Sequence, residues 1–334
     1  MKYNSLEEIL KAFKNKTVLV LGDVMVDSYL YGNAKRISPE APVPVLIANK
    51  REKRLGGAAN VAMNVQALGA KPILCSIVGD DKDGSIFEQL LKYEKMPTKG
   101  IIKSQNRVTT VKHRILSGTQ HMLRVDYEDT HPIVDLDRKS LLHHIKNLME
   151  ECDLIIFQDY DKGTLDPIVI EETIKLAAAK NIPTAVDPNQ RNFLSYKNVT
   201  LFKPNLSELK EGLELEFDVK KDAEVEDAIK QLRKKVDAKY QLVTLSDKGI
   251  FYQSEKQKGK YPALAKKQAF VSGAGDTVIS IAGLCLTLDL PLPLIAELAN
   301  LGGGIVCRTP GVTPIDIDKL LKEAQSNSIL EKYL

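Results

Sequence analysis

The sequence predicts an α/β fold: a doubly wound, mostly parallel β-sheet with helices on both faces, plus a small β-sheet that stands off it as a lid. Two patterns in the 334 residues indicate this architecture. After residue 137, apolar runs of strand length alternate with helical stretches, which is typical of βαβ units in a parallel sheet. Four earlier β-type segments do not alternate with helices, so we expect them to pair with one another.

The elements of the main sheet follow in order from the N-terminus. After a short leading helix, residues 17–21 are apolar and β-branched, which predicts a buried strand. A helix is expected from Gly56-Gly57 to Leu68, where Gly69 ends it. The later strands are expected at 72–78, 154–157, 184–186, 199–202 and 242–245, and the later helices at 83–93, 139–150, 168–180, 223–235 and 291–308.

The lid is predicted from segments with β-type composition. Residues 29–34 and 43–48 flank a stretch with three prolines at 39–44, which excludes a central strand and indicates an edge or a flap. Residues 109–116 and 122–127 alternate around Ser117-Gly118-Thr119, a hairpin signal. We therefore expect a single domain over residues 1–334, with lid segments of about 28–49 and 107–128 inserted into it.

Composition and charge exclude several classes of function. The net charge is +3 and the 47 basic residues are spread along the chain, so nucleic acid is not an expected partner. No apolar run reaches the roughly 18 residues that cross a membrane, and the charged N-terminus is not a signal peptide. The four cysteines lie far apart without CxxC spacing, which predicts buried free thiols and a cytoplasmic location.

The stretch Gly273-Ala274-Gly275-Asp276 is the strongest candidate for chemistry. Its glycines let a ligand approach the backbone closely, and a helix that begins here presents unpaired N–H groups and a partial positive charge. These features predict a site for an anion such as a transferring phosphate, with Asp276 taking a proton from the attacking hydroxyl. The alternative is a tight turn in which Asp276 only caps the helix.

Polar clusters follow several of the predicted strands, and together they predict the rim of a ligand cleft. Asp27 can accept a pair of sugar hydroxyls, although a turn aspartate would stand at the same place. Asn205 and Glu208, three residues apart at a helix start, either form a capping box or lie near Mg²⁺-bound phosphate. The glycines of Gly56–Asn60 and Gly302–Gly304 permit close approach either of a ligand or of a neighbouring helix.

Three common site types are not supported by the spacing of their residues. The P-loop pattern is absent, because Gly259-Lys260 is followed by a tyrosine. The dinucleotide fingerprint fails because Val278 stands where its third glycine belongs. His143 and His144 are adjacent and do not share a helix face, so a transition-metal site is not expected.

The motifs, taken together, resemble those of a known family. GGAAN at 56–60, PNLSE at 204–208 and SGAGDT at 272–277 resemble the ribokinase/PfkB carbohydrate kinases, over nearly the whole chain. Within that family, RISPEAPVPV at 36–45 and QDYDKG at 158–163 look like the D-glycero-D-manno-heptose-7-phosphate kinases, the kinase half of the ADP-heptose synthesis enzymes. The resemblance implies a ribokinase-like fold and, because the sequence has no nucleotidyltransferase HxGH motif, a stand-alone kinase.

The resemblance also implies roles for individual residues. Asp276 would be the catalytic base, and the anion hole would comprise Gly273, Ala274 and Gly275. The ATP and Mg²⁺ side would comprise Asn205, Ser207, Glu208, Thr244, Ser246, Gly249 and Gly303, with Glu208 reaching the metal through water. The sugar would contact Asp27, Gly56, Gly57 and Asn60. Its 7-phosphate would need cations from the lid, or these are only exposed sheet charges: Lys112, Arg114 and Arg124.

Two positions depart from the family pattern. Phe270 stands where the family has an aspartate that helps to bind a monovalent cation, so activation by such a cation is doubtful. Asn189-Gln190 replaces a Lys-Gly pair common after Asp-Pro in the heptose kinases, which weakens the assignment of the sugar.

The expected reaction is in-line transfer from MgATP to the anomeric hydroxyl of D-glycero-D-manno-heptose 7-phosphate. The product would be the 1,7-bisphosphate used in ADP-heptose synthesis, a precursor of the lipopolysaccharide core. The alternatives are a PfkB kinase for another sugar or sugar phosphate, and a non-catalytic sugar-phosphate-binding protein. A homodimer through the lid is a further expectation, based on the apolar residues Val43, Val45, Ile47 and Ile115.

Overall fold

The computed structural model describes residues 3–263, 272–309 and 311–333. Within these residues, nine strands form one sheet in the order β13-β12-β11-β10-β9-β8-β1-β4-β5. All neighbours in it are parallel except β11–β12 and β12–β13, which are antiparallel. The strands are β1 Thr17–Gly22, β4 Lys71–Gly79, β5 Ile101–Ser104, β8 Leu154–Gln158, β9 Thr184–Asp187, β10 Leu201–Phe202, β11 Tyr240–Thr244, β12 Ile250–Gln253 and β13 Lys258–Tyr261.

Helices cover both faces of this sheet, because successive residues of its buried strands point to opposite sides. Val18 and Val20 of β1 belong to the core under one set of helices, and Leu19 and Leu21 belong to the core under the other set. The first set is α1 Leu6–Phe13, α2 Ala58–Ala67, α3 Lys82–Tyr93, α8 Ala274–Leu286, α9 Leu292–Val306 and α10 Ile317–Ser326. The second is α4 Asp135–Leu148, α5 Pro167–Ala179, α6 Leu206–Leu213 and α7 Asp222–Val236.

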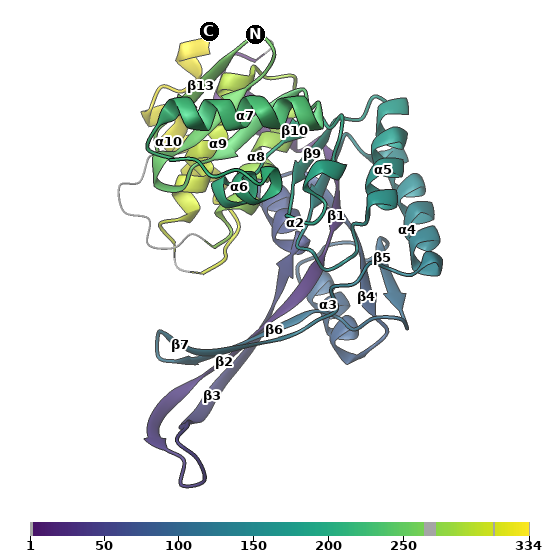
Figure 1. Cartoon of the computed structure of the whole chain (residues 1–334), viewed down its shortest axis with the longest axis vertical. Coiled ribbons are helices and arrows are strands. Elements are labelled where there is room, and N and C mark those ends of the chain that lie inside the picture. Colours follow the sequence, from purple (N-terminus) through teal and green to yellow (C-terminus); the bar gives the residue numbers. More distant parts are fainter. Residues whose placement is uncertain (1–2, 264–271, 310, 334) are drawn as a thin grey trace.

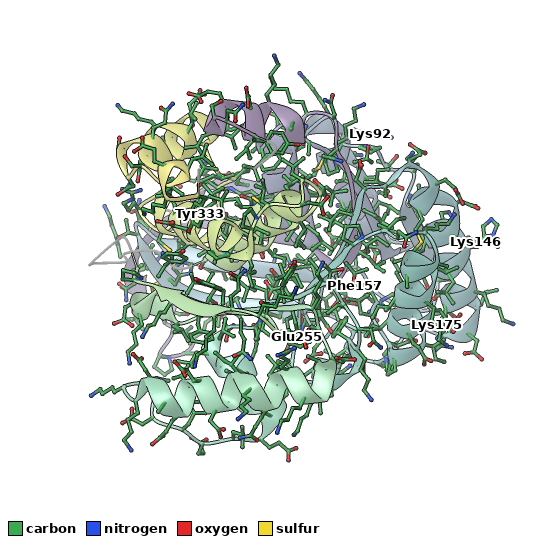
Figure 2. All side chains as sticks on the ribbon, turned by 90° about the horizontal axis from the view of Figure 1, so that it is seen from above. Lys92, Lys146, Phe157, Lys175, Glu255 and Tyr333 are labelled. Atoms are coloured by element: carbon green, nitrogen blue, oxygen red, sulfur yellow. The ribbon has the colours of Figure 1, made fainter. Side chains whose placement is uncertain are left out.

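The side chains follow this layering (Figure 2). Phe157 of β8 is fully buried in the interior between the helices. Lys146 and Lys175 extend outward from α4 and α5 at the periphery. The prediction of a doubly wound α/β fold is therefore confirmed.

The second sheet is a separate ribbon that projects from the body of the molecule (Figure 1). Its order is β3-β2-β6-β7, with β2 Val24–Ile37, β3 Pro44–Gly57, β6 Val111–Ser117 and β7 Gln120–Tyr127. The predicted small sheet is confirmed, but β2 and β3 have 14 residues each and extend beyond 29–34 and 43–48. The part of β3 that was missed pairs regularly with β2, but its residues 50–54 are all charged, so no alternation of apolar and polar residues marks it as a strand.

Several other elements differ from the expectations. The strand expected at 199–202 is reduced to β10, and β5, β12, β13 and α10 were not predicted. The edge strand β13 has no buried residue, and its neighbour β12 has only four residues, of which Ile250 and Phe251 are buried, so neither shows the apolar run of a buried strand. Cys75, Cys285 and Cys307 are buried free thiols as predicted, whereas Cys152 is half-buried.

The two ends of the chain meet at the end of the molecule opposite the lid (Figure 1). Gln325 of α10 donates a hydrogen bond to Glu7 of α1, and both helices contribute to the same core. Among the helices in the described ranges, none is long and apolar enough to cross a bilayer.

Candidate functional site

A cavity of about 690 Å³ opens where strands β8, β9 and β11 end at their carboxyl ends. Parallel sheets place their ligand sites at this edge, and the volume suits a nucleotide-sized ligand. Every residue predicted for catalysis or for the nucleotide side lines this cavity: Asn205, Ser207, Glu208, Thr244, Ser246, Gly249, Gly273, Ala274, Gly275, Asp276 and Gly303.

Helix α8 begins at the cavity wall, and its N-terminal backbone is arranged as an anion site. Gly273 is the N-cap with a φ of 85°, a left-handed conformation that favours glycine. The N–H of Thr277 donates to the carbonyl of Gly273 at 3.1 Å, so the N–H groups before it have no partner inside the helix. The start of this 13-residue helix therefore directs backbone donors and its positive dipole end at the cavity.

Asp276 does not cap this helix, so the helix-cap alternative is wrong. It lies within α8, is buried with 5% of its surface exposed, and its Oδ1 accepts a hydrogen bond of 3.0 Å from the Tyr160 hydroxyl. Burial raises the pKa of Asp276 to about 7, and Asp187 adds to the rise, while Tyr160, Lys203 and Asn60 oppose it. A carboxylate with a pKa near neutrality suits a general base.

Lys203 and Asp187 complete the electrostatics of the cavity. The sequence placed Asp187 in a polar cluster at a strand end without a role, and it gave no indication of Lys203 as a site residue. Their side chains form a buried ion pair, with Nζ 2.7 Å from Oδ1. A Cβ atom on Gly275 would lie 3.3 Å from Lys203 Nζ, so the ammonium group stands beside the anion site. Burial alone would lower the pKa of Lys203, but Asp187 and Glu208 outweigh it and the pKa is raised.

The only sequence signal for this pair is that each residue stands at the end of a predicted strand, next to a Pro. A buried lysine is rare, and nothing local in the sequence distinguishes Lys203 from the other lysines. The pairing arises because parallel strands β9 and β10 are neighbours in the sheet.

Asn205 and Glu208 form the capping box that opens α6. The N–H of Glu208 donates to Asn205 Oδ1 at 3.0 Å, and the N–H of Asn205 donates to Glu208 Oε2 at 2.7 Å. The box does not exclude a role toward phosphate, because both residues also line the cavity. Burial, followed by the charge of Asp187, raises the pKa of Glu208 to about 8.

The oxygen atoms in the cavity suit a magnesium ion bound mainly through phosphate. In the described part of the chain, no three His, Cys, Asp or Glu side chains are grouped as ligands. Among the described residues that line it, the cavity nevertheless carries the carboxyl groups of Asp187, Glu208 and Asp276 against one buried ammonium, that of Lys203. That surplus of negative charge suits Mg²⁺ held mainly by phosphate and water, with Glu208 contributing through water, since Mg²⁺ keeps several waters in such sites.

The residues predicted for the sugar lie at the root of the lid, outside the lining of the nucleotide cavity. Asp27 is buried within β2 and forms an ion pair with Arg114, so the turn-aspartate alternative is wrong. A Cβ on Gly56 would lie 2.7 Å from Asp27 Oδ2, and one on Gly57 would lie 2.4 Å from the carbonyl oxygen of Asp23. These glycines therefore permit close approach of β2 to β3 rather than of a helix.

Asn60 lies between the residues predicted for the sugar and Asp276, the predicted base. It lies buried in the first turn of α2, and hydrogen bonding with its side chain lowers the pKa of Asp276. Its Oδ1 is buried and has no hydrogen-bond partner among the described residues. Such an orphaned oxygen at the border of the two groups is suited to accept a hydrogen bond from a ligand hydroxyl.

The lid cations lie on one face of the ribbon. The strand register places Lys112 beside Asp27 and Arg114 beside Tyr29, with Arg124 opposite Arg114. Lys112 and Arg124 both form ion pairs with Asp126 of β7. Arg54 was not predicted as a site residue: its guanidinium carbon and that of Arg114 lie 5.0 and 5.3 Å from the centre of the Tyr29 ring.

The glycines of α9 face a helix. A Cβ on Gly302 would lie 2.1 Å from Ile281 Cδ1, and one on Gly303 would lie 2.9 Å from Val278 Cγ2. Close packing of α8 on α9 therefore accounts for Gly302 and Gly303, and Gly303 and Gly304 line the cavity. Phe270, the position tied to a monovalent cation, lies outside the described residues.

Comparison with known proteins identifies the family of the chain. The family described as pfkB family carbohydrate kinase matches residues 15–319. Proteins named bifunctional protein HldE are 38% identical over 305 residues in Helicobacter pylori strain G27 and 36% identical over 298 residues in Wolinella succinogenes. The matches cover 91% and 89% of this chain, which spans 65% and 62% of the lengths of these relatives.

Solved structures show the same fold. Phosphofructokinase-2 from Escherichia coli in complex with potassium has a TM-score of 0.77 at 18% identity, covering 94% of this chain and 99% of its own. Arabidopsis thaliana ribokinase complexed with ribose and ATP has a TM-score of 0.71 at 16% identity, covering 92% and 99%. The chain belongs to the pfkB family of carbohydrate kinases, phosphotransferases that act on a sugar hydroxyl.

Proposed function

We propose that this kinase transfers the γ-phosphoryl group of MgATP to the anomeric hydroxyl of D-glycero-D-manno-heptose 7-phosphate, giving the 1,7-bisphosphate. The observation that carries the transfer chemistry is the position of Asp276. Its carboxyl group, with a pKa of about 7, lies at the positive end of α8 in the same cavity as the Lys203 ammonium.

In the proposed reaction, Asp276 takes the proton of the acceptor hydroxyl as its oxygen bonds to the γ-phosphorus. The bond from that phosphorus to the β,γ-bridging oxygen breaks, and ADP leaves with the bond's electron pair. The backbone N–H groups of Gly273–Gly275 and the Lys203 ammonium stabilise the negative charge on the phosphoryl oxygens. Mg²⁺ would neutralise charge on the nucleotide phosphates, and Glu208 would hold it through water.

Two observations support a phosphorylated sugar as the acceptor. The HldE relatives match over most of this chain, which supports the resemblance to the heptose-7-phosphate kinases, whose acceptor is a sugar phosphate. In the structure, the face of the lid that carries Asp27 also carries Arg54, Lys112 and Arg114 near its root. A guanidinium group binds phosphate through paired hydrogen bonds, and Asp27 is suited to accept hydroxyl groups of the sugar.

A different sugar phosphate is the second candidate. Asn189 lines the nucleotide cavity at the position where the heptose kinases commonly have a lysine. The loss of that charge is compatible with another acceptor. A binding protein without activity is disfavoured, because binding alone needs no buried carboxyl group poised near neutrality.

We further propose a homodimer formed through the lid. Val43 and Ile47 are exposed on the β2–β3 ribbon, and Leu123 and Val125 are exposed on β7, an edge strand of the lid sheet. Val45 and Ile115 are half-buried within one copy. Exposed apolar side chains next to an open strand edge favour pairing with a second chain, which sedimentation velocity would test.

A panel of sugars and sugar phosphates in a coupled ADP-release assay tests the acceptor. We expect kcat/KM to be highest for D-glycero-D-manno-heptose 7-phosphate, with ³¹P NMR showing a new anomeric phosphate. A higher kcat/KM for another sugar phosphate would replace the heptose assignment. No ADP release with any acceptor, combined with thermal stabilisation by sugar phosphates, would support the non-catalytic alternative.

A further inference from the structure

We propose that Tyr160 is a positioning residue for the base, and that its hydroxyl holds the Asp276 carboxyl group in place at the cavity wall. Tyr160 follows β8 at the carboxyl edge of the sheet and itself lines the cavity. Its hydroxyl donates to Asp276 Oδ1 at 3.0 Å. This inference rests on the proposed role of Asp276 as the base.

The Tyr160 hydroxyl acts as a donor and not as a second base. Burial, followed by the charges of Asp276 and Asp187, raises the pKa of Tyr160 well above its usual value. The phenol therefore keeps its proton over the whole working range of pH. A donor of this kind orients a carboxylate without competing with it for the substrate proton.

The loop that carries Tyr160 is held rigidly by the Asp23 carboxylate. Asp23 is buried and accepts three backbone N–H groups, those of Tyr160 at 3.0 Å, Lys162 at 3.1 Å and Thr164 at 3.0 Å. Such a set of bonds fixes both ends of the 160–164 turn. The backbone of Tyr160 is thus anchored before any ligand binds.

A second buried carboxyl group holds the same loop from its other side. Asp159 accepts hydrogen bonds from the Tyr196 hydroxyl at 2.6 Å, from Asn192 Nδ2 at 3.1 Å and from the N–H of Asp161 at 2.9 Å. Asp161 has a φ of 56°, in the left-handed region that a non-glycine residue adopts at a cost. Because two buried carboxyl groups hold this strained turn, the turn fixes the position of the Tyr160 side chain.

Two charged groups and one neutral hydroxyl act on the pKa of Asp276, and they come from three parts of the fold. Asp187 at the end of β9 raises its pKa, whereas Lys203 before α6 and the Tyr160 hydroxyl lower it. Removing the hydroxyl leaves the effect of Asp187 less opposed. The pKa of the base then rises, and the base is ionised only at higher pH.

Tyr160→Phe removes this hydroxyl and keeps the ring. We expect kcat at pH 7 to fall about 10-fold, since hydrogen bonds to charged groups contribute on the order of one decade or more. The KM for ATP should stay unchanged. The acidic limb of the kcat/KM profile should move to higher pH, so that the deficit shrinks toward pH 9.

Tyr196→Phe is the matched control, because it removes a buried phenol hydroxyl that donates to Asp159, next to Tyr160 in the chain, and not to Asp276. We expect it to lower the melting temperature and to leave the acidic limb in place. A shift of the acidic limb by the same amount in both variants would overturn the inference. The shift would then come from a change in the loop and not from the loss of the Tyr160 hydroxyl.

An unchanged kcat and an unmoved acidic limb in Tyr160→Phe would also overturn it. Asp276→Asn, assayed in parallel, separates this failure from that of the proposed function. If Asp276→Asn is inactive while Tyr160→Phe is normal, only the positioning role is lost. If Asp276→Asn is active, the base assignment itself is lost.

Discussion

Lys203 Nζ lies 2.7 Å from Asp187 Oδ1, and the two side chains are only 2% and 8% exposed. Withdrawing two charges from water costs free energy that their attraction does not reliably return, so a buried ion pair is weak support for stability. The pair lies beside the N-terminus of α8, where a phosphoryl group would bind. We therefore interpret it as a functional pair: Asp187 keeps the lysine charged, and the lysine faces the anion site.

Lys203→Met should reduce kcat about 10²–10³-fold, the range seen when one stabilising donor of a transition state is removed. It should also lower the free energy of unfolding by roughly 3–5 kcal/mol, because the Asp187 carboxylate is left buried without a partner. Urea unfolding and ADP release measure the two effects. The double variant Lys203→Met/Asp187→Asn should regain stability but not turnover, and recovered turnover would contradict the role of the ammonium group.

Asp276→Asn should bind ATP with nearly unchanged affinity and lose about 10²–10⁴-fold in kcat, the usual contribution of a general base. The amide cannot accept the proton, whereas the anion site at the start of α8 remains. Calorimetric titration with ATP and the ADP-release assay would show this split. Near-normal turnover of Asp276→Asn would show that Asp276 is not the general base.

The pH profile of kcat/KM should have an acidic limb with a midpoint near pH 7, because the pKa of Asp276 is raised to about 7. The base works as a carboxylate, so activity is present above this pKa and is lost as the pH falls through it. An ordinary, unshifted carboxyl group would place the limb near pH 4. A profile that stays flat from pH 8 down to pH 5 would therefore contradict the assignment.

Gly302→Ala should lower the free energy of unfolding by about 1–3 kcal/mol through overpacking between α8 and α9. The new Cβ would lie 2.1 Å from Ile281 Cδ1, and this side chain is buried with little room to turn away. Ile281→Val in the same chain removes that Cδ1 atom and should restore most of the loss relative to Ile281→Val alone. Thermal unfolding measures both, and an unchanged melting temperature in Gly302→Ala would contradict the packing argument.

Arg114→Met should raise the KM for a sugar phosphate about 10-fold or more and leave the KM for ATP unchanged, since a charge-assisted pair to phosphate is lost. Lys50→Met is the control, because Lys50 lies on the same face of the lid but its side chain is 64% exposed. The KM for the unphosphorylated sugar should rise less than the KM for the sugar phosphate. An equal rise in KM for the sugar and for the sugar phosphate would contradict a phosphate contact, because it would come from the Asp27 carboxylate that has lost its partner.

Much of the architecture follows from patterns within single segments. The alternation of apolar strands with helices predicted the main sheet, because each buried strand and each amphipathic helix carries its own periodicity. The same holds for the anion site at Gly273–Asp276 and for the Asn205–Glu208 box, which are formed by residues close in sequence. The C-terminal part of β3 was missed because its residues 50–54 are all charged, so that stretch shows no apolar alternation although it pairs regularly with β2.

The sequence by itself determined the fold class, and it predicted that Gly273–Asp276, Asn205 and Glu208 belong to one site, all of which line the cavity. Only the tertiary structure decided that Tyr160 donates to Asp276, that Lys203 pairs with Asp187, and that Arg54 lies over the Tyr29 ring. These contacts join side chains from different strands, helices and loops, in the first case 116 positions apart. Local periodicity carries no record of which strand ends become neighbours, since the packing of the whole sheet decides that.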